Sequence, residues 1–406
     1  MKRYKLLNNV LGWVVFVIAA VTYILTLEST ASFWDCGEFI ASGYKLEVGH
    51  PPGNPIFMLT ARFFANFASS PSEVAYMVNL MSGLLSAATI LLLFWTITRL
   101  AQKIVLREGE TEETMSLGQM IAILGCGLVG ALAYAWSDTF WFSAVEGEVY
   151  AYSSFCTALV FWLILKWESV ADLPHANRYI ILIAYIIGVS IAVHLLNLLC
   201  IPAIVLVYYY RKYKNTDLKG SLIALLVSFV LIVLLLYGLV PGFVEVAGWV
   251  ELLFVNVFHL PFNSGVVFYF FLIVGVIAWA IYETYAQRSD KLIKISFLIS
   301  IVLVGIPFIG DGYIIGIVLT AALAYYLFTR KKLAVVAMNT ILLSLFVIFI
   351  GYSSYALIVI RSTANTPMDQ NSPEDIFSLG GYLNREQYGD LSLIHISEPT
   401  RPISIS

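Results

Sequence analysis

A series of long apolar segments constrains the fold of this chain more than any other feature of its sequence. Most are close to twenty residues long, the length that an α-helix needs to cross a hydrocarbon core of roughly 30 Å. Of the 406 residues, 60% are hydrophobic and 12% are charged, whereas about 25% are charged in a typical soluble domain. We therefore predict an all-α, polytopic membrane protein with eleven transmembrane helices. The predicted spans are Val10–Leu27, Val74–Leu100, Gly118–Ser137, Val149–Leu165, Tyr179–Leu196, Leu198–Tyr210, Ser221–Val240, Gly265–Tyr282, Ile293–Ile309, Tyr313–Phe328 and Leu333–Tyr355.

The distribution of positive charge supports this number of spans and orients them. With the N-terminus in the cytoplasm, eighteen lysines and arginines fall on the cytoplasmic side and four fall outside, as expected from the enrichment of these residues in short cytoplasmic loops. A wrong number of spans would mix the charges, so the poorly separated fifth and sixth spans are expected to form a short hairpin. The four outer basic residues are Lys45, Arg62, Arg361 and Arg385, and the outer segments include Ser29–Pro55, Asp138–Glu148, Pro241–Asn263 and Asp311.

The outer loop Ser29–Pro55 is a polar interruption between two apolar spans. From Phe33 onward it has the spacing of an amphipathic helix, which would lie in the interface with its acidic side free to face a cavity. The following HPPGNP segment cannot continue a helix, because each proline lacks an N–H donor and restricts the residue before it. We interpret this loop as the part of the chain that carries chemistry. One predicted face holds Phe33, Gly37, Ile40 and Tyr44, and the other holds Asp35, Glu38, Ser42 and Lys45.

Asp35 and Glu38 are the candidate catalytic residues of this loop. A carboxylate at the boundary between water and lipid can act as a general base on a hydroxyl or stabilise a developing cation. The alternative is structural, because Ser32 followed three residues later by Asp35 has the spacing of a capping box.

A second acidic site, Glu146 and Glu148 followed by Tyr150, directly precedes a predicted span. These residues are candidates for binding a substrate. The positive end of the helix dipole could instead explain why acidic residues stand there, and it explains Glu148 better than Glu146.

Polar residues near the outer ends of other spans are further candidates for substrate binding: His50, His194, Asn197 and Arg361. Histidine can bind a phosphate or a sugar hydroxyl, and Arg361 could pair with a lipid-linked phosphate or only extend to the interface. External histidines and carboxylates could also form a metal site. No closely spaced histidine pair supports one, so we predict no metal ligands.

Several classes of protein lack support in this sequence. It contains no nucleotide-binding loop and no metalloprotease or serine-hydrolase motif. No basic block indicates nucleic acid, and the four cysteines are dispersed without metal-binding spacing. Ionisable residues are nearly absent from the middle of the spans, where transporters usually carry them.

The hydropathy falls after Tyr355, and we divide the chain there. Residues 1–355 form the predicted transmembrane domain, and 356–390 begin an extracytoplasmic soluble region that stops before it could form a core. Residues 391–406 resemble the translation of a sequencing-library adapter, so we exclude this tail from functional reasoning.

Four groups of residues, taken in order along the chain, resemble the domain of unknown function 2723 family. That family is grouped as glycosyltransferase family 117 and is related to a human transmembrane protein O-mannosyltransferase. The residues that carry the resemblance are Asp35, Glu38, His50, Pro51, Pro52, Gly53 and Pro55 in the first loop, Glu146, Glu148, Val149 and Tyr150 in the second, HLLNLL from His194, and Arg361, Asn365 and REQYGD from Arg385.

The resemblance implies a GT-C fold, a membrane enzyme that uses a polyprenyl-phosphate sugar and works at the extracytoplasmic face. In such folds an acidic residue of the first outer loop is the usual catalytic base, and the match falls on Asp35 with Glu38 beside it. Relatives commonly continue into a large soluble domain, and we expect residues 356–390 to be the truncated start of such a region.

Our leading hypothesis is transfer of a sugar, mannose, from a lipid-phosphate donor to a hydroxyl of an exported protein or glycan. The expected location is the cytoplasmic (inner) membrane of a bacterium, in contact with membrane lipid and without a nucleic-acid partner. Two alternatives belong to other classes: a transporter or flippase for a lipid-linked sugar, and a membrane scaffold without catalysis.

Overall fold

The computed structural model describes residues 2–308, 313–330, 332 and 334–389. Asp311 and the adapter-like tail, residues 391–406, lie outside the described residues. Within them the chain is helical, and its only strand-like pairing is an isolated bridge between Val48 and Asp369. The prediction of an all-α polytopic membrane protein is confirmed.

A helix is found at each of the eleven predicted spans. By length and composition, eight continuous helical segments of the described chain could cross a membrane. The other three, α8, α13 and α14, have 14, 14 and 17 residues. The helices at the predicted spans are α1 (Lys2–Leu25), α4 (Val74–Val105), α5 (Leu117–Ala135), α7 (Val149–Val170), α8 (Arg178–Ile191), α9 (Ile201–Lys212), α10 (Leu218–Val233), α12 (Ser264–Ala286), α13 (Asp290–Leu303), α14 (Tyr313–Thr329) and α15 (Val335–Tyr352).

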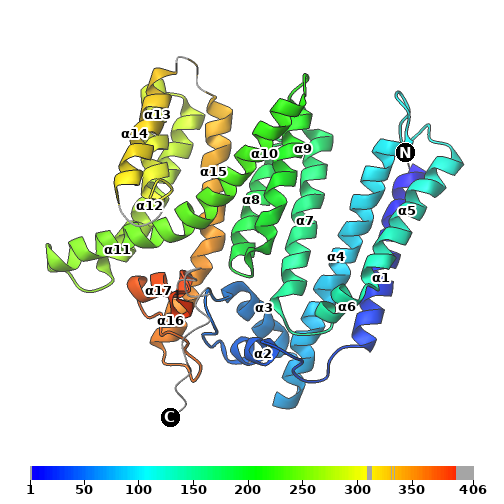
Figure 1. Cartoon of the computed structure of the whole chain (residues 1–406), viewed down its shortest axis with the longest axis horizontal. Helices are drawn as coiled ribbons and strands as arrows, with labels where there is room; N and C mark the ends of the chain where they lie inside the picture. Colours follow the sequence, from blue (N-terminus) through cyan, green and yellow to red (C-terminus); the bar gives the residue numbers. More distant parts are fainter. Residues whose placement is uncertain (1, 309–312, 331, 333, 390–406) are drawn as a thin grey trace, which may run out of the picture.

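The helix that begins as α10 continues well past its predicted end. A π-helical turn over Leu234–Leu239 joins it to α11 (Val240–Asn256), so the segment predicted as an outer loop from Pro241 is largely helical. Pro241 has no N–H for the carbonyl four residues earlier, and a π-helical turn is one way to continue a helix past such a break. In Figure 1, α11 runs across the ends of α12 and α14 rather than alongside them.

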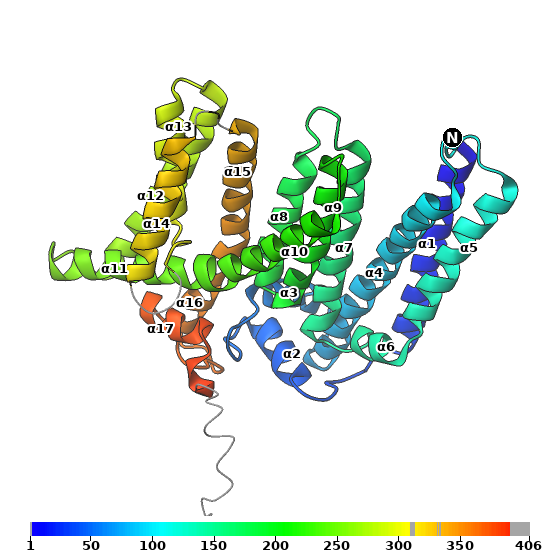
Figure 2. The ribbon, with the colours of Figure 1, turned by 45° about the horizontal axis from the view of Figure 1, so that its top comes forward.

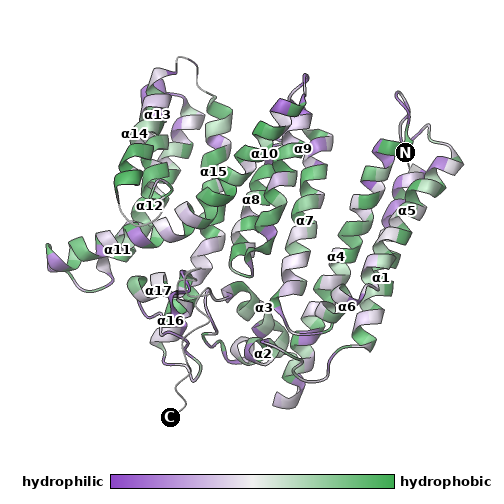
Figure 3. Ribbon diagram, viewed as in Figure 1, coloured by the Kyte–Doolittle hydropathy of each residue, from purple (hydrophilic) through white to green (hydrophobic). Residues whose placement is uncertain are grey.

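The short helices gather at one end of the bundle, opposite the N-terminus (Figures 1 and 2). The apolar residues follow the long helices between the two ends (Figure 3). Backbone groups of a spanning segment must bond to one another, because hydrocarbon offers them no partner. The elements at this end are α2 (Cys36–Lys45), α3 (Pro55–Ala65), α6 (Asp138–Ala144), α16 (Ala356–Thr363) and α17 (Ile376–Leu383).

Helix α2 differs in two ways from the helix predicted in the first loop. It begins at Cys36, so Phe33 lies outside it and is 72% exposed. Ser42, predicted on the polar face, is buried and donates to the carbonyl of Phe39. The assignments of Phe33 and Ser42 were therefore wrong. The reason is that Cys36, Phe39 and Ile40 form the buried face of α2, which is rotated by about one residue from the predicted apolar face.

Glycines bring α8 and α15 into backbone contact. A Cβ atom at Gly188 would lie 2.7 Å from both the Cα and the carbonyl oxygen of Ile348, and one at Gly351 would lie 2.4 Å from the carbonyl carbon of Gly188. Because the obstructing atoms are backbone, no rotamer change can relieve the clash. Small residues allow this kind of close helix approach within membranes.

Replacing Gly188 with valine should separate α8 from α15 and lower the free energy of unfolding by about 1–3 kcal/mol. Thermal unfolding of the purified protein in detergent measures this. Gly125→Ala and Gly275→Ala are matched controls in other spans, since no atom lies within 4 Å of a Cβ at either position. Equal melting temperatures for Gly188→Val and the controls would contradict the close approach.

Candidate active site

The loop after α2 folds back over the helix and positions His50. Leu46 ends α2 in the left-handed region with φ 54°. Val48 then pairs with the segment before α17: its N–H donates to Met368 (3.0 Å) and its carbonyl accepts from Gln370 (3.2 Å). This pairing turns the chain back, so that His50 lies above the side of α2 that carries Glu38.

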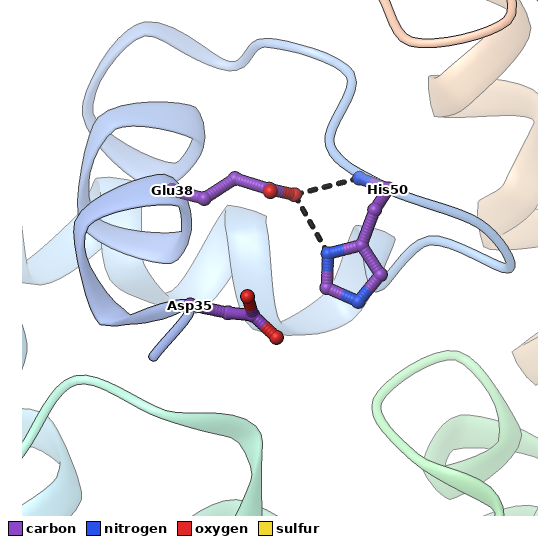
Figure 4. Close-up of side chains that lie close together, drawn as sticks. All are labelled: Asp35, Glu38 and His50. Atoms are coloured by element: carbon purple, nitrogen blue, oxygen red, sulfur yellow. Dashed lines mark hydrogen bonds and ion pairs between the residues drawn. The ribbon is translucent and has the colours of Figure 1, made fainter. Parts of the chain in front are cut away.

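Glu38 and His50 form the best-defined polar contact of the site (Figure 4). One carboxylate oxygen, Oε1, accepts from the backbone N–H of His50 at 2.6 Å and contacts its Nδ1 at 2.8 Å. The other, Oε2, accepts from the side-chain amide of Gln370 at 3.3 Å. Glu38 is thus held on both oxygens by two segments far apart in sequence.

The contact favours a charged pair. Partial burial would raise the pKa of Glu38, but the hydrogen bonds from His50 and Gln370 outweigh it and lower that pKa. The hydrogen bond to Glu38 raises the pKa of His50, assisted by the charges of Glu38 and Asp35 and opposed by burial. A negative Glu38 and a positive His50 therefore stabilise each other.

Asp35 lies beside this pair and is exposed (Figure 4). It occupies the N-cap position of α2, but its side chain makes no capping hydrogen bond. Ser32, the other member of the suggested capping box, bonds to the Glu146 side chain instead. The capping-box alternative is therefore wrong, and the Asp35 carboxylate faces open space next to the Glu38–His50 pair.

Asp35, Glu38 and His50 offer ligand atoms that all lie within 4.8 Å of one another, the one such group among the described residues. Two carboxylate oxygens and one imidazole nitrogen are a plausible ligand set for a divalent cation. The His50 Nδ1 is already engaged by Glu38, so a cation would use Nε2 or displace this contact. The absence of metal ligands stays a prediction.

The second acidic site is buried next to the first. Glu146 and Glu148 are 3% and 5% exposed. Cys36 directly follows Asp35 in the chain, and its thiol donates to Glu146 Oε2 at 3.5 Å. Burial, followed by the charges of Glu146 and Glu148, raises the pKa of Cys36, so the thiol keeps its proton. The structure therefore brings both predicted acidic sites together.

The two buried glutamates resist ionisation. Burial raises the pKa of Glu146. Burial and the charge of Glu146 raise the pKa of Glu148 to about 7, although its Oε2 accepts from the backbone N–H of Val149 (3.1 Å) at the start of α7. The suggested interaction with the helix N-terminus is thus present for Glu148. It coexists with an environment that keeps this carboxyl half-protonated near neutral pH.

Tyr150, His194 and Asn197 lie on the α7 side of the acidic groups. The rings of Tyr150 and His194 are 5.5 Å apart, edge to face. His194 Nδ1 accepts from the backbone of Leu196 (3.1 Å), and burial lowers the pKa of this histidine. Asn197 is buried, and neither of its side-chain polar atoms has a hydrogen-bond partner in the described chain.

Arg361 lies at the other end of α2 from Asp35. Its guanidinium donates to the carbonyls of Leu46 (2.6 Å) and Lys45 (3.4 Å), which end that helix. A ten-residue helix is roughly 15 Å long, so Arg361 does not join the acidic groups. It anchors α2 through the last carbonyls, a common role of arginine at helix C-termini.

Cys36, Ser32 and Gln370 are site residues that sequence reasoning missed. The sequence analysis noted Cys36 only as one of four dispersed cysteines, yet its thiol contacts Glu146. Gln370 lies 332 residues from Glu38 in the chain, and no spacing rule connects them. Its position directly after Asp369, in the polar segment beyond the last span, was the only available signal.

The fold and site thus define a multi-pass membrane protein with clustered carboxyl groups and a histidine at one end of its bundle. Residues 35–217 match the family model described as the protein O-mannosyl-transferase TMEM260 N-terminal domain. The matched range begins at Asp35 and includes every site residue predicted from the sequence except Arg361. No solved structure matches the chain.

Two curated proteins show the same similarity. The protein O-mannosyl-transferase TMEM260 of Mus musculus is 27% identical over 209 residues, which is 52% of this chain and 27% of the mouse protein. The protein O-mannosyl-transferase tmem260 of Dictyostelium discoideum is 23% identical over 189 residues, 45% of this chain and 20% of that protein. The matches support an O-mannosyltransferase-like family, although this chain aligns with only about a quarter of its relatives' length.

The raised pKa of Glu148 predicts a pH dependence of stability. Between its ordinary value of 4.5 and about 7, the folded protein holds a proton at Glu148 that the unfolded chain releases. Folding therefore loses stability as the pH rises through this interval. The Glu148→Gln variant cannot ionise, so its melting temperature should fall less between pH 5 and 8 than that of the unmodified protein.

Thermal unfolding in detergent across this pH range measures the difference. Glu108→Gln, which replaces an exposed glutamate, is the control and should follow the unmodified protein. Parallel curves for Glu148→Gln and the unmodified protein would contradict the buried, proton-binding state of Glu148.

Proposed function

We propose that this protein is a membrane glycosyltransferase that transfers mannose from a polyprenyl-phosphate donor to a hydroxyl of an exported protein or glycan. The observation that carries the proposal is the arrangement of Asp35 beside the Glu38–His50 pair at one end of a helical bundle. A lipid-linked phosphate must sit at the membrane interface, where such an end lies. The relatives are named protein O-mannosyl-transferases, which supports a sugar donor and a protein acceptor.

Asp35 is the proposed general base. Both oxygens of Glu38 are occupied by His50 and Gln370, whereas the Asp35 carboxylate is exposed and free of capping bonds. In the proposed step the acceptor oxygen attacks the anomeric carbon as its proton passes to Asp35. The bond between that carbon and the phosphate oxygen breaks, and the lipid phosphate leaves with the electron pair.

The remaining residues would bind and orient the two substrates. A protonated His50 can neutralise charge on the donor phosphate. Burial raises the pKa of both Glu146 and Glu148, that of Glu148 to about 7, and a protonated carboxyl can donate to a sugar hydroxyl as well as accept from one. Tyr150, His194 and Asn197 would extend this surface toward α8, where the unpartnered amide of Asn197 offers a further hydrogen bond.

The proposed orientation places the N-terminus in the cytoplasm and the acidic groups outside a bacterial inner membrane. The segregation of lysine and arginine supports it. A flippase would use the same end of the bundle as an entry gate. Purified protein in vesicles separates the two, because a flippase would move a lipid-linked sugar across the bilayer without cleaving it.

Asp35→Asn should abolish sugar transfer, with a loss of at least about 100-fold expected for removal of a general base. A strain lacking the gene is complemented with each variant, and hexose on serine and threonine of exported proteins is measured by mass spectrometry. Asp138→Asn, an exposed carboxyl in the first turn of α6, is the control. Undiminished transfer by a folded Asp35→Asn variant would remove Asp35 as the base.

Glu38→Gln should reduce transfer and change its pH dependence. Because the bond to Glu38 is the main cause of the raised pKa of His50, His50 in this variant should lose its proton at lower pH. The alkaline limb of the pH–rate profile should therefore move to lower pH, while Asp138→Asn leaves it in place. A lower rate with an unmoved profile would mean that Glu38 acts without His50.

A further inference from the structure

A cavity of about 430 Å³ lies at the opposite end of the bundle from the acidic groups. It is formed by the N-terminal end of α1 and the C-terminal ends of α4 and α7, which lie at the same end in both views of the ribbon (Figures 1 and 2). None of the candidate active-site residues lines it. We call it the α1–α4–α7 pocket and define it by Lys5, Arg99, Lys166, Trp95, Trp162 and Asn8.

The pocket has an excess of positive charge. Lys5, Arg99 and Lys166 line it, with Glu112 as the one acidic residue. Glu112 is paired with Lys5, at 3.6 Å. Arg99 bonds only to the neutral amide of Gln102 (3.4 Å), and neither Arg99 nor Lys166 forms an ion pair within the described ranges.

Two basic residues near this pocket do have acidic partners. Lys103 pairs with Glu168, and Arg211 pairs with Asp172. Arg99 and Lys166, in contrast, line a cavity and form no ion pair in the part of the chain that the structure describes. Cations grouped around a cavity without a carboxylate partner are suited to an anionic ligand.

Two tryptophans indicate the depth of the pocket relative to the membrane. The rings of Trp95 and Trp162 are 5.8 Å apart, and Lys166 Nζ lies 4.9 Å from the Trp162 ring centre. Tryptophan is enriched at the level of lipid headgroups. The side-chain oxygen of Asn8 is buried in the pocket wall without a hydrogen-bond partner in the described chain, so the wall also offers an unused hydrogen-bond acceptor.

We propose that the α1–α4–α7 pocket binds a phosphate group, carried by an anionic membrane lipid. Arg99 can bind two phosphate oxygens at once, and Lys166 supplies a second positive charge. The tryptophan rings would contact the glycerol and upper acyl chain. Basic pockets between spanning helices are known to take anionic headgroups. Because α1, α4 and α7 each contribute a basic residue, the bound phosphate would link the three helices.

The test is ligand-dependent thermal unfolding of the purified chain in detergent. The probes are dioctanoyl phosphatidic acid, dioctanoyl phosphatidylcholine and inorganic phosphate. Phosphatidic acid should raise the melting temperature saturably, because a ligand that binds the folded state alone stabilises it, and phosphatidylcholine should not. In the double variant Arg99→Gln, Lys166→Gln the apparent affinity should fall at least tenfold.

The matched control is the double variant Lys103→Gln, Arg211→Gln, which removes two cations of the same face that already have acidic partners; it should respond to phosphatidic acid as the unmodified protein does. If the Arg99 variant does not fold, Lys166→Gln alone carries the test, since Lys166 is exposed.

Each result bears on the proposal. A rise with inorganic phosphate that Lys166→Gln weakens would support the phosphate site and assign it to a soluble source. A rise with phosphatidic acid alone would assign it to lipid. Equal rises in the unmodified protein and the pocket variants, or no rise with either phosphate probe, would overturn the proposal.

Discussion

The requirement that every backbone N–H and C=O be bonded within the hydrocarbon core governs this structure. Helices meet that requirement within one segment, so the long apolar stretches become helices and charged side chains collect at the two ends of the bundle. At one end a loop between the first two spans folds into α2 and α3. Everything proposed here about chemistry depends on how that loop is held against the helix ends.

The loop is held by contacts that come from the far end of the chain. Arg361 caps the last carbonyls of α2, Val48 pairs with the segment at Met368, and Gln370 reaches Glu38. These contacts set the position of His50, whose bonds occupy Glu38 and leave Asp35 free. The polar segment beyond the last span therefore holds the first loop in position, even though it contributes no candidate base.

The two ends of the bundle have opposite electrostatic character. Glu146 and Glu148 are buried at one end, which favours their protonated forms, whereas Arg99 and Lys166 line a cavity at the other; none of the four forms an ion pair with another described residue. α4 and α7 extend between the two regions, and α7 begins directly after Glu148 and carries Lys166 near its end. One pair of helices thus connects the proposed catalytic groups to the proposed phosphate pocket.

The apolar lengths alone predicted the helices, because crossing hydrocarbon leaves a segment few alternatives; a helix is found at each of the eleven predicted spans. The sequence also marked residues 29–55 as a polar element between two spans. Sequence could also select Asp35, Glu38, Glu146 and Glu148 as acidic candidates. Only the tertiary structure decided that the two acidic pairs meet through Cys36, and that Glu38 is bound by His50 and Gln370. It also showed that Arg361, a predicted partner for a phosphate, binds a carbonyl at the C-terminal end of α2. The physical reason is that helix formation depends on neighbouring residues, whereas hydrogen bonds between residues hundreds of positions apart depend on how the whole bundle packs.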